Sequence, residues 1–329
     1  MPKTVLWWMR TRSCSASNPL EYWGQASSQL EAAALSTKVA YIGIGAMGYP
    51  MAGYLSSRGY DVSVYDTDSS RVDAWTTEFK GHGRTSAADA AEGAEWVFSS
   101  VSTEEQVLAS TTGKDGTFQS MVPRGIYVDH TTTSAVLARN LSSIARENNL
   151  VYLDAPVAGS PAEAARDGKL LIMVGGNKLA FEKVLPALNC YGSEIQHLGP
   201  TGAGQLTKMV SQIAIAGIVE SLAEALHFSQ YSGLDGEQVV NLLLQGPATS
   251  WWMTHRARPM LEDRHDIGGP IRNMLKDYTM CLDEAERIGA RLPVVDLVYQ
   301  FCNEIAAQGD SERDFTGLIK FLNDTAARS

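Results

Sequence analysis

KVAYIGIGAMG, residues 38–48, is the stretch of sequence that decides the fold. A short apolar run typical of a buried strand leads directly into the glycine motif GIGAMG, residues 43–48. Gly43 permits a tight turn, Gly45 lets the backbone approach a pyrophosphate, and Gly48 lets the following helix pack close to the strand. The stretch therefore predicts a strand, a dinucleotide-binding turn and a helix. The cofactor-binding residues predicted in this turn are Gly43, Ile44, Gly45, Ala46, Met47 and Gly48.

A carboxylate follows at the end of the next predicted strand, DVSVYD, residues 61–66. At this place Asp66 can accept hydrogen bonds from both hydroxyls of a ribose, and its charge would repel a 2′-phosphate. Thr67 follows it, where an arginine would favour a phosphate. The sequence therefore favours NAD over NADP, with Arg71 near enough to reach a phosphate all the same.

Strands and helices alternate along the first part of the chain. Further strands are predicted at 95–102, 125–133, 150–156 and 169–176, with helices at 135–147 and 179–188 between them. This alternation predicts a Rossmann-type α/β fold with a doubly wound, mainly parallel sheet. After about Gly199 only helical periodicity remains, at 206–228, 236–244, 274–287, 293–307 and 314–322. We expect a dinucleotide-binding domain over 37–199 and an all-α domain for substrate and dimerisation over 200–329.

Composition narrows the range of partners. The net charge of −10 argues against nucleic acid or an anionic membrane as a general partner, which leaves small molecules. The four cysteines are scattered without metal-ligand or disulfide spacing, so no metal is expected. The longest apolar run, 209–219, is interrupted by Ser211 and Gln212 and is shorter than a membrane span.

Residues 1–36 differ in composition from the rest of the chain. The first twenty residues contain Lys3, Arg10 and Arg12 with three serines and no acid, as mitochondrial presequences do, while Glu21 and Glu31 fit that pattern less well. A transit peptide and a disordered or mis-assigned extension both remain open. The expected location is accordingly the mitochondrial matrix or the cytoplasm.

Lys208 is the only formally charged residue between Glu194 and Glu220, near the start of a long apolar helix. A buried lysine loses part of its affinity for its proton, which suits it to acid/base chemistry. Taken alone, a lysine whose stem lies on apolar surface while its head reaches water explains it more simply. The cofactor fold that precedes it favours catalysis. Gln212, four residues later, shares its helical face.

Several ordered motifs carry a family resemblance. GIGAMG, DHTTTSA (129–135), DAPVAGS (154–160), GAGQLTKMVSQ (202–212) and LKD (275–277) resemble those of the β-hydroxyacid dehydrogenases. That family includes 3-hydroxyisobutyrate dehydrogenase, tartronate semialdehyde reductase and, more distantly, 6-phosphogluconate dehydrogenase. The resemblance covers about 38–322 and implies a dinucleotide-binding domain, a helical domain and assembly as dimers or tetramers.

The resemblance also implies roles for individual residues. Lys208 matches the catalytic general acid and base, Thr132 a position that touches nicotinamide and substrate, and Lys276 a lysine that reaches across to the cofactor. The implied substrate-binding residues are Thr132, Gly159, Ser160, Gln212 and Trp251, and the further cofactor-binding residues are Val101, Ser102, Gln106, Thr132 and Lys276. Of Trp251 and Trp252, at most one should face the pocket. His130 matches a variable position and is expected to be a bystander.

The family pattern is not followed everywhere. Relatives typically have DAPVSGG, whereas this chain has Ala158, Gly159 and Ser160 at its last three positions, and 100–102 replaces Met-Leu-Pro. Backbone amides at Gly159 and Ser160 could still hold a carboxylate.

The sequence therefore predicts an NAD(P)-dependent oxidoreductase of a small 3-hydroxy acid, 3-hydroxyisobutyrate-like, or its semialdehyde. Imine reductases share the architecture but typically lack the lysine. The alternatives are a secondary-metabolism reductase of a bulkier ketone and a non-catalytic dinucleotide-binding module.

Overall fold

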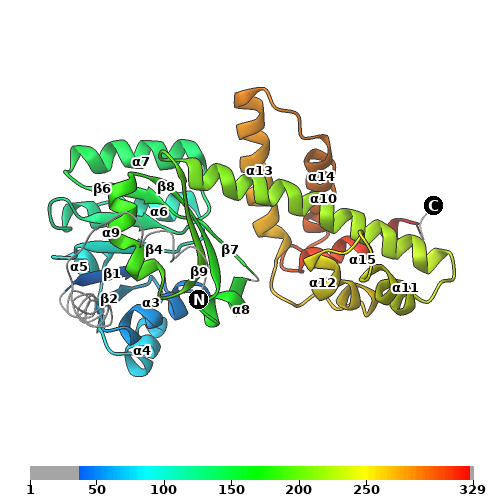
Figure 1. The fold of residues 1–329 in the computed structure, drawn as a ribbon, viewed down its shortest axis with the longest axis horizontal. Coiled ribbons are helices and arrows are strands. Elements are labelled where there is room, and N and C mark those ends of the chain that lie inside the picture. Colours follow the sequence, from blue (N-terminus) through cyan, green and yellow to red (C-terminus); the bar gives the residue numbers. More distant parts are fainter. Residues whose placement is uncertain (1–36, 160, 327–329) are drawn as a thin grey trace, which may run out of the picture.

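A computed structural model describes residues 37–159 and 161–326 of the protein. The extension predicted over 1–36 and the proposed substrate residue Ser160 lie outside the described residues. Figure 1 shows an α/β body and a helical body connected by one long helix, α10 (Ala203–Tyr231).

The sheet of the α/β body has nine strands in the order β3-β2-β1-β4-β5-β6-β8-β7, with β9 paired to β8. Strands β1 to β6 run parallel, β8 is antiparallel to β6 and β7, and β9 is parallel to β8. The chain order reverses beside β1, as expected for a doubly wound sheet. The strands are β1 (Lys38–Ile42), β2 (Asp61–Tyr65), β3 (His82–Gly83), β4 (Trp96–Ser99), β5 (Ile126–Asp129), β6 (Val151–Asp154), β7 (Val157–Ala158), β8 (Leu170–Gly176) and β9 (Gly192–Gly199).

Helices cover both faces of the sheet, so its central strands are apolar on both sides. Along β1, Val39 and Tyr41 enter one core and Ala40 and Ile42 enter the other. The covering elements are α3 (Gly48–Ser57), α4 (Ser69–Glu78), α5 (Ala87–Ala91), α6 (Glu104–Thr111), η1 (Thr117–Gln119), α7 (Ala135–Glu147), α8 (Pro161–Arg166) and α9 (Lys178–Leu188).

The second body is all helical and packs around α10. Its other elements are α11 (Gly236–Leu243), α12 (Trp251–Leu261), α13 (Ile271–Ile288), α14 (Pro293–Ala307), η2 (Phe315–Gly317) and α15 (Leu318–Ala326). The predicted fold class, Rossmann-type followed by all-α, is confirmed. The precise domain limits, 37–199 and 200–329, stay a prediction.

Helix α10 is more apolar than its sequence pattern suggested. Among the described residues, α10 is the one helix whose length and composition would allow it to cross a membrane. In its most apolar 18-residue window, 44% of the residues are buried inside the protein. Its inner face carries Ala216, Val219, Ala223 and Leu226 into the helical core. We interpret it as the central helix of that core.

Candidate active site

The turn after β1 has the geometry that a dinucleotide needs. Gly43 has φ 82°, and a Cβ atom there would lie 2.5 Å from the carbonyl oxygen of Ser100. A Cβ on Gly48 would collide with the carbonyl of Gly43, so the start of α3 lies directly against the turn. Among the described residues, only Arg71 Nη1 would lie within 4 Å of a Cβ atom on Gly45, and none of their side chains caps α3. The open backbone at a helix N-terminus fits a pyrophosphate.

Asp66 lies at the end of β2 beside this turn. Its Oδ2 accepts a hydrogen bond from the Ile44 amide at 2.9 Å, and its Oδ1 accepts one from the Asp68 amide at 2.9 Å. Arg71 Nη1 lies 3.5 Å from the same Oδ1, with an Arg71 side chain that is 51% exposed. The carboxylate is therefore held at the mouth of the turn with an exposed cation next to it.

A cavity of 460 Å³ opens along the carboxyl ends of β1, β2 and β4. Of the predicted cofactor-binding residues, it is lined by Gly43, Gly45, Asp66, Val101, Ser102 and Gln106. Its wall also contains Arg71, Thr85, Ser86 and Lys114, of which the sequence singled out Arg71 alone. Together with the turn after β1, this donor-rich wall fits a nicotinamide dinucleotide.

A buried carboxylate, Asp129, joins the ends of β4, β5 and β6. It accepts hydrogen bonds from Ser99 Oγ at 2.9 Å, Tyr152 Oη at 2.8 Å and the Thr131 amide at 2.9 Å. Thr131 Oγ1 in turn accepts from the Val101 amide at 3.1 Å. These hydrogen bonds join the loops after β4 and β5.

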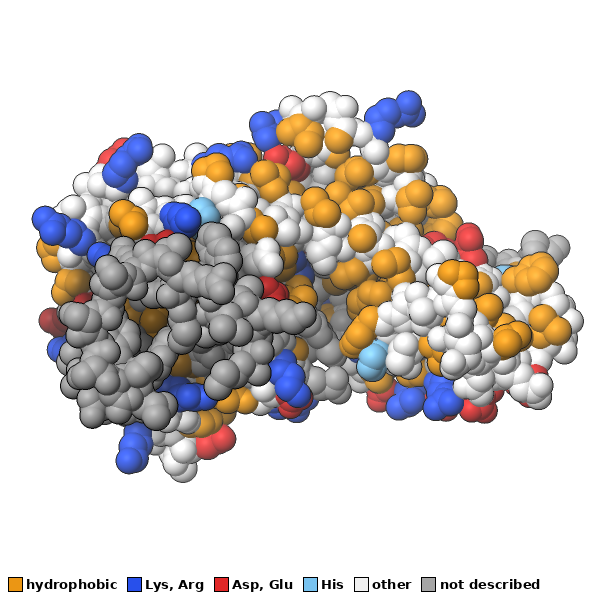
Figure 2. Space-filling model, in the orientation of Figure 1, with side chains coloured by type: hydrophobic (Ala, Val, Ile, Leu, Met, Phe, Trp, Pro, Cys, Tyr) orange, Lys and Arg blue, Asp and Glu red, His pale blue; other side chains and the backbone are white. Residues whose placement is uncertain are grey.

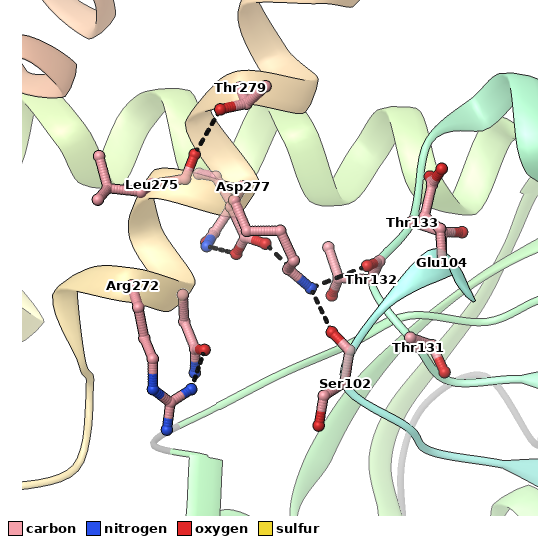
Figure 3. Close-up of polar contacts among 12 residues, drawn as sticks. Ser102, Glu104, Thr131, Thr132, Thr133, Arg272, Leu275, Asp277 and Thr279 are labelled. Carbon is pink, nitrogen blue, oxygen red and sulfur yellow. Dashed lines mark hydrogen bonds and ion pairs between the residues drawn. The ribbon is translucent and has the colours of Figure 1, made fainter. Parts of the chain in front are cut away.

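Lys276 connects the helical body to these loops. Its Nζ donates to the carbonyl oxygens of Thr132 at 3.0 Å and Ser102 at 3.3 Å. Dashed lines in Figure 3 mark the contacts at the labelled Thr132 and Ser102. It also lies 3.6 Å from Asp277 Oδ1. The structure thus places predicted cofactor residues from both bodies in contact.

Lys208 lies on the second turn of α10, half-buried beside the same region. Burial lowers the pKa of its ammonium, the Asp277 carboxylate opposes that shift, and Lys276 adds to it. Gln212 is buried one turn later, and its Nε2 donates to Asp277 Oδ2 at 2.5 Å. The other oxygen, Asp277 Oδ1, has no hydrogen-bond partner among the described residues. Asp277 therefore organises the site, although the sequence noted it only as part of LKD.

Over its described ranges, the structure does not link two of the predicted substrate residues, Gly159 and Trp251, to Lys208. No hydrogen bond or ion pair among residues 37–159 and 161–326 connects Gly159 or Trp251 to Lys208. Trp251 is 43% exposed and stacks on His255 with ring centroids 4.1 Å apart. Trp252 packs against Phe315 at the edge of the helical core, as expected for one of the pair.

His130 is buried, and both of its ring nitrogens are hydrogen-bonded within the protein. One ring nitrogen contacts the Ala155 carbonyl at 2.7 Å and the other the Tyr191 hydroxyl at 2.9 Å. Burial lowers the pKa of its imidazole to about 4, so it stays neutral near pH 7. No group of three or more His, Cys, Asp or Glu suited to a metal ion occurs in the part of the chain that the structure describes.

Comparisons with known proteins agree with this geometry. Residues 38–199 match the NAD binding domain of 6-phosphogluconate dehydrogenase, and residues 202–322 match the NAD-binding domain of NADP-dependent 3-hydroxyisobutyrate dehydrogenase. The chain is 42% identical to an uncharacterized oxidoreductase of Shewanella frigidimarina, covering 87% of this chain and 98% of that protein. It is 30% identical to an NAD-dependent L-serine dehydrogenase of Pseudomonas aeruginosa, over 88% and 98% of the two chains.

Among solved structures, the fold is similar to that of 3-hydroxyisobutyrate dehydrogenase from Mycobacterium tuberculosis, determined with L-serine. The TM-score is 0.79 at 25% identity, over 87% of this chain and 99% of that one.

Proposed function

Since the chain belongs to the β-hydroxyacid dehydrogenase family, an NAD(P)-dependent group acting on CH–OH donors, we propose that its substrate is a small 3-hydroxy acid or the corresponding semialdehyde. The observation that carries this proposal is the cluster of Lys208, Gln212 and Asp277 beside the loops that line the cofactor cavity. The size of the acid follows 3-hydroxyisobutyrate and L-serine, which the names of the relatives supply.

In the proposed reaction, Lys208 transfers the proton. The cofactor, when bound, supplies or accepts the hydride. During reduction the Lys208 ammonium donates its proton to the oxygen on which negative charge develops, and during oxidation the neutral amine takes the proton from the hydroxyl. Because burial lowers the pKa of Lys208, both forms are more nearly accessible at working pH than for an exposed lysine.

Gln212 is held in one orientation by its bond to Asp277. With Nε2 committed to the carboxylate, the amide oxygen is left as a hydrogen-bond acceptor for a substrate hydroxyl. Thr132, beside the Lys276 contact, and the backbone at Gly159 and Ser160 are proposed to complete substrate binding. Trp251 is proposed to line the substrate pocket.

For the cofactor we favour NAD. Asp66 is fixed by two backbone amides and would oppose a 2′-phosphate, while its Arg71 neighbour softens that opposition. We expect NADH to bind more tightly than NADPH in a fluorescence titration. Equal or reversed affinities would remove Asp66 as the determinant of cofactor choice.

We also propose that the protein assembles as a homodimer or homotetramer through its helical body. Ile218 on α10 and Val294 and Leu297 on α14 are exposed apolar side chains, defined here as the apolar face. Figure 2 shows apolar side chains gathered over this part of the helical body. Location in the mitochondrial matrix or the cytoplasm stays a prediction, because it depends on residues 1–36.

The function is tested by a spectrophotometric screen and one variant. With NAD and NADP, the screen covers 3-hydroxyisobutyrate, L-serine, other 2- and 3-hydroxy acids, bulkier alcohols and amines. For the best acid, Lys208→Met is expected to lower kcat at least about a hundredfold and to leave the Kd for NADH unchanged. Turnover of bulky alcohols alone would favour the ketone reductase. Complete inactivity with cofactor still bound would favour the non-catalytic module.

A further inference from the structure

A buried amide that the proposed chemistry does not use, that of Gln205, lies between Lys208 and the loop after β5, which contains Thr131, Thr132 and Thr133. Gln205 is in the first turn of α10 and is 0% exposed. Its Nε2 donates to the Thr131 carbonyl oxygen at 2.7 Å, and its Oε1 accepts from the Thr133 amide at 3.1 Å. One side chain therefore holds the backbone on both sides of Thr132.

The end of α10 that carries Gln205 is itself fixed to the sheet. Its N-cap residue is Gly202, at φ 93°, and no side chain within the helix caps it. Asp154, buried at the end of β6, accepts from the Gly202 amide at 2.8 Å and the Gln205 amide at 3.0 Å. A carboxylate from another element thus replaces the missing cap and complements the helix dipole.

The first turn of α10 packs tightly against strands β6 and β8. A Cβ on Gly204 would lie 2.7 Å from the Asp154 carbonyl oxygen, and one on Gly175 would lie 2.6 Å from Asp154 Oδ1. The first turn of α10 therefore rests directly on the strand ends of β6 and β8. Because the helix packs this closely, the sheet fixes the position of the side chains on the next turn of α10.

Lys208 is one turn after Gln205, on the same side of α10. We propose that Gln205 is a positioning residue that sets Thr132, in the loop after β5, in register with the Lys208 ammonium. Gln205 acts through Thr132 and α10 and touches neither substrate nor cofactor. The proposal rests on the proposed function, in which proton and hydride must reach adjoining atoms of one substrate. A displacement of about 1 Å in such a site can cost on the order of a hundredfold in rate.

Two substitutions separate positioning from packing. Gln205→Met keeps the approximate volume and removes both hydrogen bonds. Gln205→Glu introduces a carboxyl that can restore both bonds only when protonated, because its O–H then donates to Thr131 while its other oxygen accepts from Thr133. Burial beside the Thr131 carbonyl should raise the pKa of the introduced carboxyl towards neutrality.

The readout is kcat for the best acid of the screen, taken as a ratio to wild type from pH 8 to pH 6, with NADH affinity measured in parallel. For Gln205→Met we expect kcat to fall about ten- to a hundredfold at every pH, with the Kd for NADH within about threefold of wild type. For Gln205→Glu we expect a similar loss at pH 8 that recovers as the pH is lowered. Melting temperatures confirm that each variant is folded.

Asn323→Ala is the matched control, because it removes a 2.6 Å contact with His227 at the opposite end of α10. It is expected to leave kcat unchanged. If folded Gln205→Met keeps kcat within about threefold of wild type, or if the two Gln205 variants show the same pH dependence, the positioning role is wrong. Failure of the proposed function itself is seen separately, as an unchanged kcat in Lys208→Met.

Discussion

At the scale of the residue, the free energy of protonating Lys208 is set mainly by burial and by two neighbouring charges. Burial lowers the pKa of its ammonium, the Asp277 carboxylate raises it, and the Lys276 ammonium lowers it. The two neighbours are adjacent in the sequence, yet they act on Lys208 with opposite sign. This arrangement gives a pair of substitutions whose effects on the pH profile must differ in direction.

We expect Asp277→Asn and Lys276→Met to shift the pH profile of carbonyl reduction in opposite directions. Reduction needs the Lys208 ammonium, so kcat falls as the pH rises through the pKa of Lys208. Asp277→Asn removes a charge that stabilises the ammonium, which lowers this pKa and moves the fall to lower pH. Lys276→Met removes a repelling charge and moves the fall to higher pH.

The profiles are measured as kcat with saturating NADH and semialdehyde, so that weaker binding in either variant does not distort them. Oxidation of the acid, which needs the neutral amine, serves as the internal control, since its rising limb should shift in the same direction as the falling limb of reduction. Shifts of the same sign in both variants would contradict the assignment of the titrating group to Lys208.

At the scale of the element, the sequence predicted those helices and strands whose pattern is local. Residues 135–147 and 293–307 are helices with the predicted limits, and β1, β2, β5 and β6 occupy predicted strands. Strand β9 was missed because its sequence, GSEIQHLG, contains no continuous apolar run. Helix α12 was given no limits, since Pro259 interrupts a weakly amphipathic segment.

The site divides in the same way. Gly43, Asp66 and Lys208 stand in motifs whose residues are close in the sequence. The contacts that arrange the site join Gln212 to Asp277 across 65 residues and Gln205 to Thr131 across 74. Such pairings depend on how α10 crosses between the two bodies, which periodicity does not report. The motifs contain Gln205, Gln212 and Asp277, but the sequence does not indicate which residues they contact.

Helix α10 also contains a buried group with no catalytic task, Glu220. It is 5% exposed, neither carboxylate oxygen has a hydrogen-bond partner among the described residues, and burial, with Glu224 nearby, raises its pKa to about 7. Between about pH 4.5 and 7 the folded protein holds a proton there that the unfolded chain releases. Stability therefore falls as the pH rises through this window, by on the order of 3 kcal/mol.

We expect Glu220→Gln to raise the melting temperature above pH 7 by several degrees and to have little effect near pH 4.5. The amide keeps the shape of the side chain and carries no charge to be desolvated. Glu304→Gln, at an exposed position on α14, is the control and should change the melting temperature only slightly. Equal stabilisation by Glu220→Gln at both pH values would show that charge burial is not the cause.

At the scale of the whole molecule, the two bodies are joined by α10 and by the Lys276 contacts across the cofactor-binding edge. The helical body has its own core on the inner side of α10, yet it leaves the apolar face of Ile218, Val294 and Leu297 outside, at 36%, 53% and 45% exposure. Gly217 lies against Val294, which brings α10 and α14 together in one continuous surface. Covering it with a second copy would remove apolar area from water without disturbing the cofactor edge.

We therefore expect the protein to be an oligomer in solution and the double substitution Val294→Asp with Leu297→Asp to make it a monomer. Two carboxylates on this surface would have to be desolvated in any interface between copies, which opposes association. Size-exclusion chromatography with light scattering gives the mass of each form. Leu179→Asp, at a side chain 69% exposed on α9 of the α/β body, is the matched control and should keep the wild-type mass. A monomeric wild type, or a double variant with unchanged mass, would show that the apolar face does not mediate assembly.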